Sequence, residues 1–218
     1  MKTLAFDTTT GFCSVMLTDN QNVRDVFCEP LVFGQSELLM VKIKEMLDAA
    51  CWHVRDLDLV AVCTGPGSYT GLRSSIAVAR SFGLASPKTT IAGVNAFDVY
   101  AKGSPADKRA DLNAVIVETK REDFYVAYYN KDLKVLEKGK TAFAQDIILD
   151  IGNKRVSLCG DGVSRFLSLT NGLNTEHAVC DEKPSVETLG SIAGERFAAG
   201  SVDFPHPVYL KSADICVK

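Results

Sequence analysis

The sequence predicts an α/β protein in which two similar halves enclose a cleft. Both halves begin with three strand-like segments joined by polar turns, and both continue with a helix, a strand and a helix. A stretch rich in glycine, proline and charge separates them at residues 102–108. We therefore expect an N-terminal domain over residues 1–103 and a C-terminal domain over residues 104–218, with the last helix able to pack back on the first domain.

The composition is that of a soluble globular protein. The chain has 218 residues, of which 46% are hydrophobic and 23% are charged. A net charge of -3 argues against a surface that grips nucleic acid unaided. Seven cysteines without a closely spaced pair offer no zinc doublet and suggest reduced thiols. No apolar run is long enough to span a membrane, and Asp7 interrupts any signal peptide, so a cytoplasmic protein is expected.

The first expected strand ends in a turn that carries an acid and three hydroxyl groups. Asp7 follows the strand at residues 4–6, and Thr8, Thr9 and Thr10 precede a glycine. In some nucleotide-binding folds such a turn faces the phosphates and their metal ion. The alternative is that Asp7 caps the turn through its own side chain. The sequence leaves both interpretations open.

Residues 36–51 are expected to form the first long helix, with Ser36 as its N-cap. At 100° per residue its apolar side chains cover an arc of roughly 140°, broader than the ~100° stripe that contact with one sheet requires. This predicts spare apolar surface on the helix. The arc consists of Leu39, Met40, Ile43, Met46, Leu47, Ala50 and Cys51.

A glycine-rich turn at residues 65–71 joins a strand at 59–63 to a second helix at 70–84. Its spacing matches neither a P-loop nor a dinucleotide fingerprint, so it is weak support for a nucleotide. The helix has one apolar stripe, Leu72, Ile76, Ala79 and Phe82 or Gly83, and one stripe of small residues, Ser74, Ala77, Val78, Ser81 and Ala85. We expect it to pack on its own sheet and lie close to a second helix, although a core helix covered by the chain's own loops fits the pattern too.

The second half lacks an open counterpart of the first turn. The strand at 114–117 ends at Glu118, and the turn at 119–122 is bulky and charged. Gly160, Asp161 and Gly162 form a later candidate phosphate loop. The three histidines are isolated in sequence, so no metal site is expected.

Several of these motifs together resemble a known family. They are residues 4–9, 36–39, 160–162 and 207–211 and above all Gly65-Pro66-Gly67-Ser68-Tyr69-Thr70-Gly71-Leu72-Arg73. The chain resembles the TsaB (YeaZ) proteins of tRNA threonylcarbamoyladenosine (t6A) biosynthesis, which belong to the ASKHA superfamily of actin, sugar kinases and Hsp70. It departs from the family pattern at Gln35, where histidine is common, and at 118–120, where Glu-Thr-Lys replaces Asp-Ala-Arg.

The resemblance implies a non-catalytic subunit. The partner TsaD transfers the threonylcarbamoyl group to N6 of adenosine 37 in tRNAs that read ANN codons, and the ATPase TsaE docks near the junction. TsaB-like proteins pair with TsaD through helices of their N-terminal domains, or with themselves in its absence. The resemblance further implies that tRNA is reached only through the complex, that no membrane is involved, and that no cofactor binds the isolated chain, with ATP or ADP at most at the junction.

Carried onto this sequence, the resemblance places the partner or dimer interface on the two N-terminal helices. The expected interface residues are Ser36, Leu39, Met40, Ile43, Met46, Leu47, Thr70, Ser74, Ala77, Val78 and Ser81. Vestigial phosphate loops are expected at Asp7, Thr8, Thr9, Gly160, Asp161 and Gly162.

Two other functions remain open. One is an ATP-dependent small-molecule kinase or ATPase of the same fold, with the residues of these vestigial loops around the phosphates. The other is a metallopeptidase, which the missing histidine ligands disfavour.

Overall fold

The computed structural model describes the chain except residues 21, 32–34, 171–172, 174 and 211–218. The first half contains β1 (Lys2–Asp7), β2 (Phe12–Asp19), β3 (Asn22–Pro30), α1 (Gln35–Ala49), β4 (Leu59–Cys63), α2 (Tyr69–Ala85), β5 (Thr90–Val94) and α3 (Ala96–Gly103). The second half contains β6 (Leu112–Glu118), β7 (Phe124–Tyr129), β8 (Val135–Ala142), α4 (Ala144–Ile151), β9 (Val156–Cys159), α5 (Val163–Ser168), β10 (Thr175–Val179) and α6 (Val186–Ala198).

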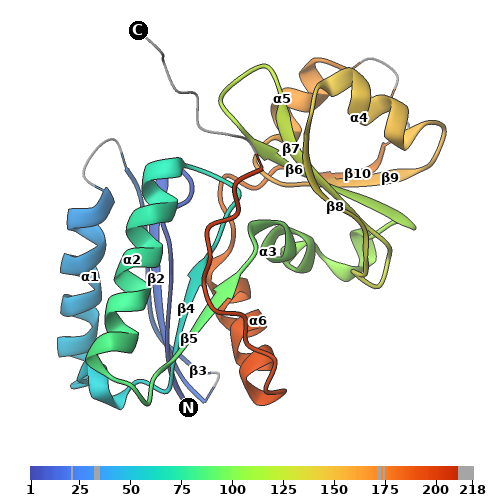
Figure 1. The fold of residues 1–218 in the computed structure, drawn as a ribbon. Coiled ribbons are helices and arrows are strands. Elements are labelled where there is room, and N and C mark those ends of the chain that lie inside the picture. Colours follow the sequence, from blue (N-terminus) through green and yellow to red (C-terminus); the bar gives the residue numbers. More distant parts are fainter. Residues whose placement is uncertain (21, 32–34, 171–172, 174, 211–218) are drawn as a thin grey trace, which may run out of the picture.

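Each half is built on one five-stranded mixed sheet (Figure 1). The strand orders, β3-β2-β1-β4-β5 and β8-β7-β6-β9-β10, are the same when corresponding strands are matched. The central strands β1 and β6 pair antiparallel with the hairpin strand on one side and parallel with the crossover strand on the other. The predicted α/β class with a repeated topology is confirmed, and each repeat extends by one further strand and helix.

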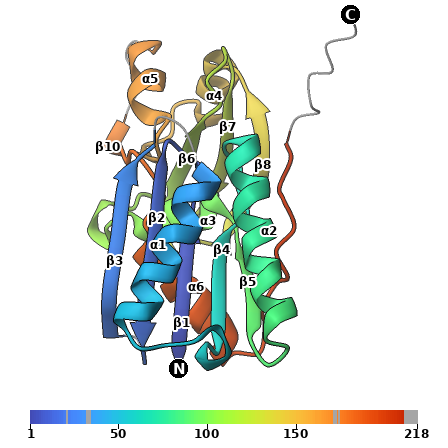
Figure 2. The same cartoon turned by 90° about the vertical axis from the view of Figure 1, so that its left-hand side faces the viewer.

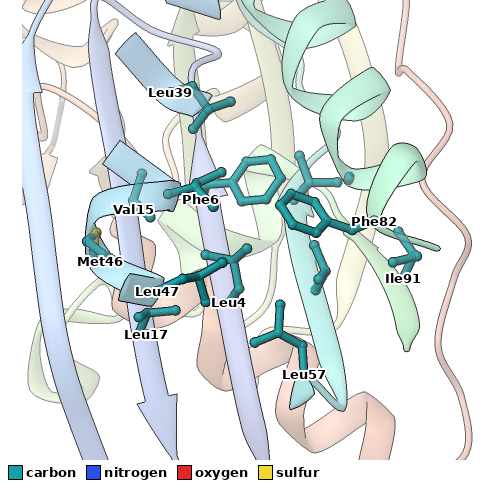
Figure 3. Packing of buried hydrophobic residues seen from close by; sticks show 14 of the residues in the cluster. Leu4, Phe6, Val15, Leu17, Leu39, Met46, Leu47, Leu57, Phe82 and Ile91 are labelled. Carbon is teal, nitrogen blue, oxygen red and sulfur yellow. The ribbon is translucent and has the colours of Figure 1, made fainter. Parts of the chain in front are cut away.

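Helices α1 and α2 lie side by side over one face of the first sheet (Figures 1 and 2). Strand residues that point to this face, such as Leu4, Phe6 and Val15, pack against Leu39, Leu47 and Phe82 of the two helices (Figure 3). The alternate residues of β1, β4 and β5 point to the other face, because side chains alternate along a strand. There they pack against α6.

The two halves exchange their last helices. Helix α3 belongs to the first half in sequence, yet Phe97, Tyr100 and Ala101 pack on the second sheet. Helix α6 belongs to the second half and covers the first sheet with Val186, Leu189 and other apolar residues. Both helices therefore lie between the two sheets, as Figure 1 shows.

A polar cluster fixes this arrangement at the contact of α3 and α6. Tyr129 of β7 donates a hydrogen bond of 2.8 Å to the carboxylate of Asp98 on α3. The guanidinium of Arg196 on α6 approaches the other oxygen of Asp98 at 2.7 Å. One carboxylate thus joins an element of the second sheet to both exchanged helices.

Element boundaries differ from expectation most at β8. The sequence suggests a strand over residues 133–137, whereas β8 spans Val135–Ala142. This strand lies at the edge of the second sheet, and most of its side chains are exposed or half-buried. It consequently lacks the apolar alternation by which a strand is recognised in sequence.

Candidate functional site

The turn between β1 and β2 is buried and internally hydrogen bonded. The exposed fractions of Asp7, Thr8 and Thr9 are 2%, 0% and 1%. The backbone N–H of Thr9 donates to Oδ1 of Asp7 at 2.8 Å, so Asp7 caps its own turn. The hydroxyl of Thr8 donates to the carbonyl of Gly71 at 2.8 Å. The structure thus shows the turn cap, and the interpretation of this turn as a phosphate loop stays a prediction.

The glycine-rich turn packs directly on the β1–β2 turn. The N–H of Ser68 donates to the carbonyl of Thr9 at 2.6 Å. A Cβ at Gly67 would lie 2.4 Å from the same oxygen, so only glycine permits this approach. The carbonyl of Thr9 in the β1–β2 turn is therefore in direct contact with the backbone of the glycine-rich turn.

Burial controls the ionisation of Asp7. Removal from water raises the pKa of this carboxyl, and hydrogen bonds from Thr9, Cys63 and Thr8 only partly oppose the shift. Within the described residues no cationic side chain forms an ion pair with it. Asp7 in turn adds to the effect of burial in raising the pKa of the Cys63 thiol.

The corresponding turn in the second half is held by Arg165 of α5. Its Nε and Nη2 donate to the two carboxylate oxygens of Glu118 at 2.7 and 2.8 Å. Nη2 also donates to the carbonyl of Asp123 at 2.8 Å, and the guanidinium lies 3.7 Å from the ring centroid of Phe124. This two-point contact was missed by sequence reasoning, because Arg165 lies 47 positions from Glu118 and belongs to no recognised motif.

The loop at 160–162 is shaped by its contact with β6. The N–H of Gly162 donates to the carbonyl of Ile116 at 3.0 Å, and a Cβ at Gly160, whose φ is 117°, would lie 2.3 Å from that oxygen. Between them Asp161 accepts a hydrogen bond of 2.9 Å from the N–H of Glu118. Burial, followed by the charges of Glu118 and Asp7, raises the pKa of Asp161 to about 7.

The β1–β2 turn, the glycine-rich turn and the turn after β6 border a cleft of about 840 Å³ between the halves. Tyr100 of α3 and Asp161 also line this cleft. The hydroxyl of Tyr100 is buried and has no hydrogen-bond partner within the described part of the chain. The rings of Tyr69 and Tyr209, 5.5 Å apart, form another wall. The cleft has the size of a small-molecule site, although the turns that would hold phosphates are bonded internally.

Helix α2 presents its two predicted stripes to different surroundings. Its apolar stripe is buried in the core below α1 and α2, as expected: Leu72, Ile76, Ala79 and Phe82. In the stripe of small residues, Ala77 and Ser81 are exposed, and Ser74 and Val78 are half-buried. Thr70 is exposed as well, which leaves a strip of small side chains on the surface of α2.

The expected interface on α1 requires correction. Four of its residues belong to the core of the chain itself, because α1 contacts both the sheet and α2 and so buries a wider arc than contact with the sheet alone would: Leu39, Ile43, Met46 and Leu47. Met40 remains on the surface, 45% exposed. The side chain of Ser36 lies outside the described residues. Val41 and Leu84, 51% and 86% exposed, were missed; Leu84 follows Ala77 by seven positions and so continues its line on α2.

Residues 203–209, here called the C-terminal strap, run beside β5 toward the cleft (Figure 1). The N–H of Gly93 donates to the carbonyl of Asp203 at 2.7 Å, and that of Val208 donates to the carbonyl of Thr64 at 2.9 Å. Arg80 of α2 donates to the carbonyl of Pro205 at 2.6 Å. The strap thus covers one flank of α2, while Thr70, Ala77 and Leu84 stay accessible.

The described residues contain no group of three or more histidine, cysteine, aspartate or glutamate side chains placed to hold a metal ion. Across the same part of the chain, no helix combines the length and the apolar character needed to cross a membrane.

Comparison with known proteins finds relatives whose names all refer to the same tRNA modification. The family model described as "TsaD: tRNA N6-adenosine threonylcarbamoyltransferase" matches residues 34–156. The TsaB protein of tRNA threonylcarbamoyladenosine biosynthesis from Escherichia coli K12 is 25% identical over 97% of this chain and 95% of its own length. The TsaB protein of Buchnera aphidicola is 28% identical over 63% and 64%. The chain belongs to the TsaB (YeaZ) family, within the wider family that the TsaD model describes.

Solved structures agree with this membership at the level of the fold. YeaZ from Pseudomonas aeruginosa superposes with a TM-score of 0.80 at 21% identity, covering 96% of this chain and 99% of that one. An activator of 2-hydroxyisocaproyl-CoA dehydratase from Clostridium difficile with bound ADPNP gives a TM-score of 0.53 at 10% identity, covering 93% and 98%. The fold of this TsaB-family chain is thus the ASKHA fold.

Proposed function

We propose that this chain is a non-catalytic subunit for N6-threonylcarbamoylation of adenosine 37 in tRNAs that read ANN codons. It binds the catalytic subunit TsaD through α1 and α2 and organises it together with the ATPase TsaE. The TsaB-family relatives, whose names refer to this pathway, support the role in t6A biosynthesis. The turns at Asp7 and Glu118, whose polar groups form hydrogen bonds within the chain, favour organisation of a partner over phosphate transfer.

The single observation that carries the partner role is the exposed strip on α2. Thr70, Ala77 and Ser81 place small side chains on the surface of a helix whose other face is core. Met40 and Val41 on the neighbouring α1 and Leu84 at the end of α2 are exposed apolar side chains as well. Small residues allow a second pair of helices to approach closely, and an exposed apolar patch marks a contact surface. In the absence of TsaD, the same strip pairs two copies of this chain in an isologous dimer.

The decisive experiment is reconstitution of adenosine modification with TsaC, TsaD and TsaE, with and without this chain. The variant Ala77→Glu would bury a charge without a partner at the interface and should weaken association by about 3 kcal/mol. Ala198→Glu, an exposed substitution on α6 at the opposite face of the sheet, is the matched control. We expect modification to require the chain, to fall strongly with Ala77→Glu and to be unchanged with Ala198→Glu.

Two outcomes would contradict the proposal at different levels. Modification that proceeds equally well without the chain would refute the role in the pathway. Co-purification of the Ala77→Glu variant with TsaD at wild-type yield would refute the interface. Turnover of ATP by the isolated chain, followed by phosphate release, would favour the kinase or ATPase alternative instead.

A further inference from the structure

A second pocket lies at the end of the second sheet where β6 and β9 begin, away from the cleft. It has a volume of about 450 Å³ and borders the first residue of β6, Leu112, and the residues just before β9. The cleft instead borders the last residues of β6 and the loop after β9. Because β6, β9 and β10 run parallel, the two sites are separated by the length of the strands. We call this site the basic pocket; its charged lining is Arg109, Asp111, Lys131, Lys154, Arg155 and Glu176.

The balance of charge in the basic pocket is positive, in contrast to the chain as a whole. Four cationic and two anionic side chains line it, whereas the net charge of the chain is -3. Glu176 is engaged by Arg155 at 3.1 Å. Lys131 and Lys154 are exposed, and no ion pair is found for either among the described residues. Apart from this pair, the charged lining consists of three cations, Arg109, Lys131 and Lys154, and one anion, Asp111. This leaves an excess of positive charge that favours a bound anion.

Arg109 gives the basic pocket a fixed donor. Its Nη2 donates to the carbonyls of Lys102 and Ser104 at 3.1 and 2.8 Å, which holds the guanidinium in place at the end of α3. Its Nε is buried and has no hydrogen-bond partner within the described part of the chain. The held guanidinium places a planar cation in the lining of the basic pocket, where it would stabilise an anionic oxygen.

The rest of the lining selects the kind of anion. The lining residues that the structure describes include no aromatic side chain on which a base could stack. Recognition of unpaired bases in RNA relies on such stacking, whereas helical RNA is held mainly through phosphates and riboses. We propose that the basic pocket binds a phosphodiester group of the tRNA backbone, without reading its sequence, within the assembly. This inference rests on the proposed function, and it adds a contact between this chain and the RNA.

The test is tRNA affinity of the assembly with TsaD and TsaE, measured by fluorescence anisotropy over a series of salt concentrations. The double variant Lys131→Gln/Lys154→Gln should weaken binding about fivefold and lower the slope of log affinity against log salt by about one phosphate contact. Lys88→Gln/Lys138→Gln is the matched control, because it removes the same charge from exposed lysines outside the pocket. The control should leave affinity and slope unchanged relative to the wild type.

Two results would overturn the proposal. One is equal affinity and equal slope for the double variant and its control. The other combines two measurements: calorimetry shows that inorganic phosphate binds the isolated wild-type chain and not the double variant, and the tRNA affinity of the assembly is the same for both. The pocket would then bind free phosphate. Since affinity and not modification is measured, a normal modification rate alongside either result would leave the proposed function standing.

Discussion

Asp161 is the residue whose ionisation should be visible in the stability of the whole chain. Its pKa is raised from 3.8 to about 7, chiefly by burial. The folded state therefore binds this proton more tightly than the unfolded chain does, so the free energy of unfolding falls as pH rises from 3.8 to about 7. In Asp161→Asn the amide oxygen can still accept the hydrogen bond from Glu118, and no charge develops. We expect the stability of the variant relative to wild type to increase between pH 5 and pH 8 by about 1 kcal/mol or more.

Urea unfolding of both proteins at the two pH values measures this difference, in which the contributions of titrating groups that do not interact with Asp161 cancel. A difference that is the same at pH 5 and pH 8 would show that Asp161 titrates normally. An NMR titration of the carboxyl would then place its pKa near 4 instead of near 7.

The same group of residues shows what sequence can and cannot predict at this scale. Capping by Asp7 could be proposed from the sequence, because the hydrogen bond from Thr9 joins residues only two positions apart and an aspartate in a turn indicates it. The bond from Arg165 to Glu118 and the orphaned hydroxyl of Tyr100 were not predicted. Each depends on chain segments brought together by the tertiary fold, for which no local pattern exists.

At the scale of elements, the position of α2 depends on the contact of two turns. Gly67→Ala would place a Cβ 2.4 Å from the carbonyl oxygen of Thr9, and this neighbour is backbone that cannot rotate away. The glycine-rich turn would have to move off the β1–β2 turn, together with the first residues of α2. We expect the free energy of unfolding to fall by about 2 kcal/mol, as overpacking of a close contact typically costs. Chemical denaturation followed by circular dichroism measures it.

The neighbouring turn supplies the control for this substitution. A Cβ added at Gly11 would meet no heavy atom within 4 Å, and Gly11 is not held at positive φ. Gly11→Ala should therefore change stability little, or raise it slightly through the entropy of the unfolded chain. Equal effects of the two substitutions would mean that the contact at Gly67 does not position α2.

Helices α1 and α2 were predicted with different success. The spacing of apolar residues indicates which side chains are buried, but not which element buries them. On α2 the apolar stripe and the stripe of small residues were separated correctly, since only one of them faces the sheet. On α1 the wide apolar arc was interpreted as spare surface, whereas most of it is buried by contact with both the sheet and α2. The packing of the C-terminal strap was not predicted either, although residues 207–211 belong to the family motifs, because its bonds to Gly93 and Thr64 are backbone bonds that most sequences could form.

At the scale of the whole molecule, the exchange of α3 and α6 makes the two halves depend on each other. Each sheet has one face covered by helices of its own half, α1 and α2 or α4 and α5. The other face is covered by the helix that the opposite half supplies, α6 or α3. A division between residues 103 and 104 therefore separates both sheets from part of their cores. The cleft and the strip on α2 are held in fixed relation by this exchange.

It follows that residues 1–103 and 104–218, made separately, should not fold as independent units. The first fragment would expose the apolar face that α6 covers, including Ala5, Met16 and Ala61, and the second would lose Phe97 and Tyr100 from its own core. We expect neither fragment alone to unfold cooperatively in urea, and an equimolar mixture to regain part of the transition of the full chain. Joining residues 184–200 to the first fragment through a flexible linker should restore a cooperative transition, because it returns the missing helix. If the unaided fragment 1–103 unfolds in a single sharp transition with a slope appropriate to its size, the exchanged helix is dispensable and the two halves are independent domains.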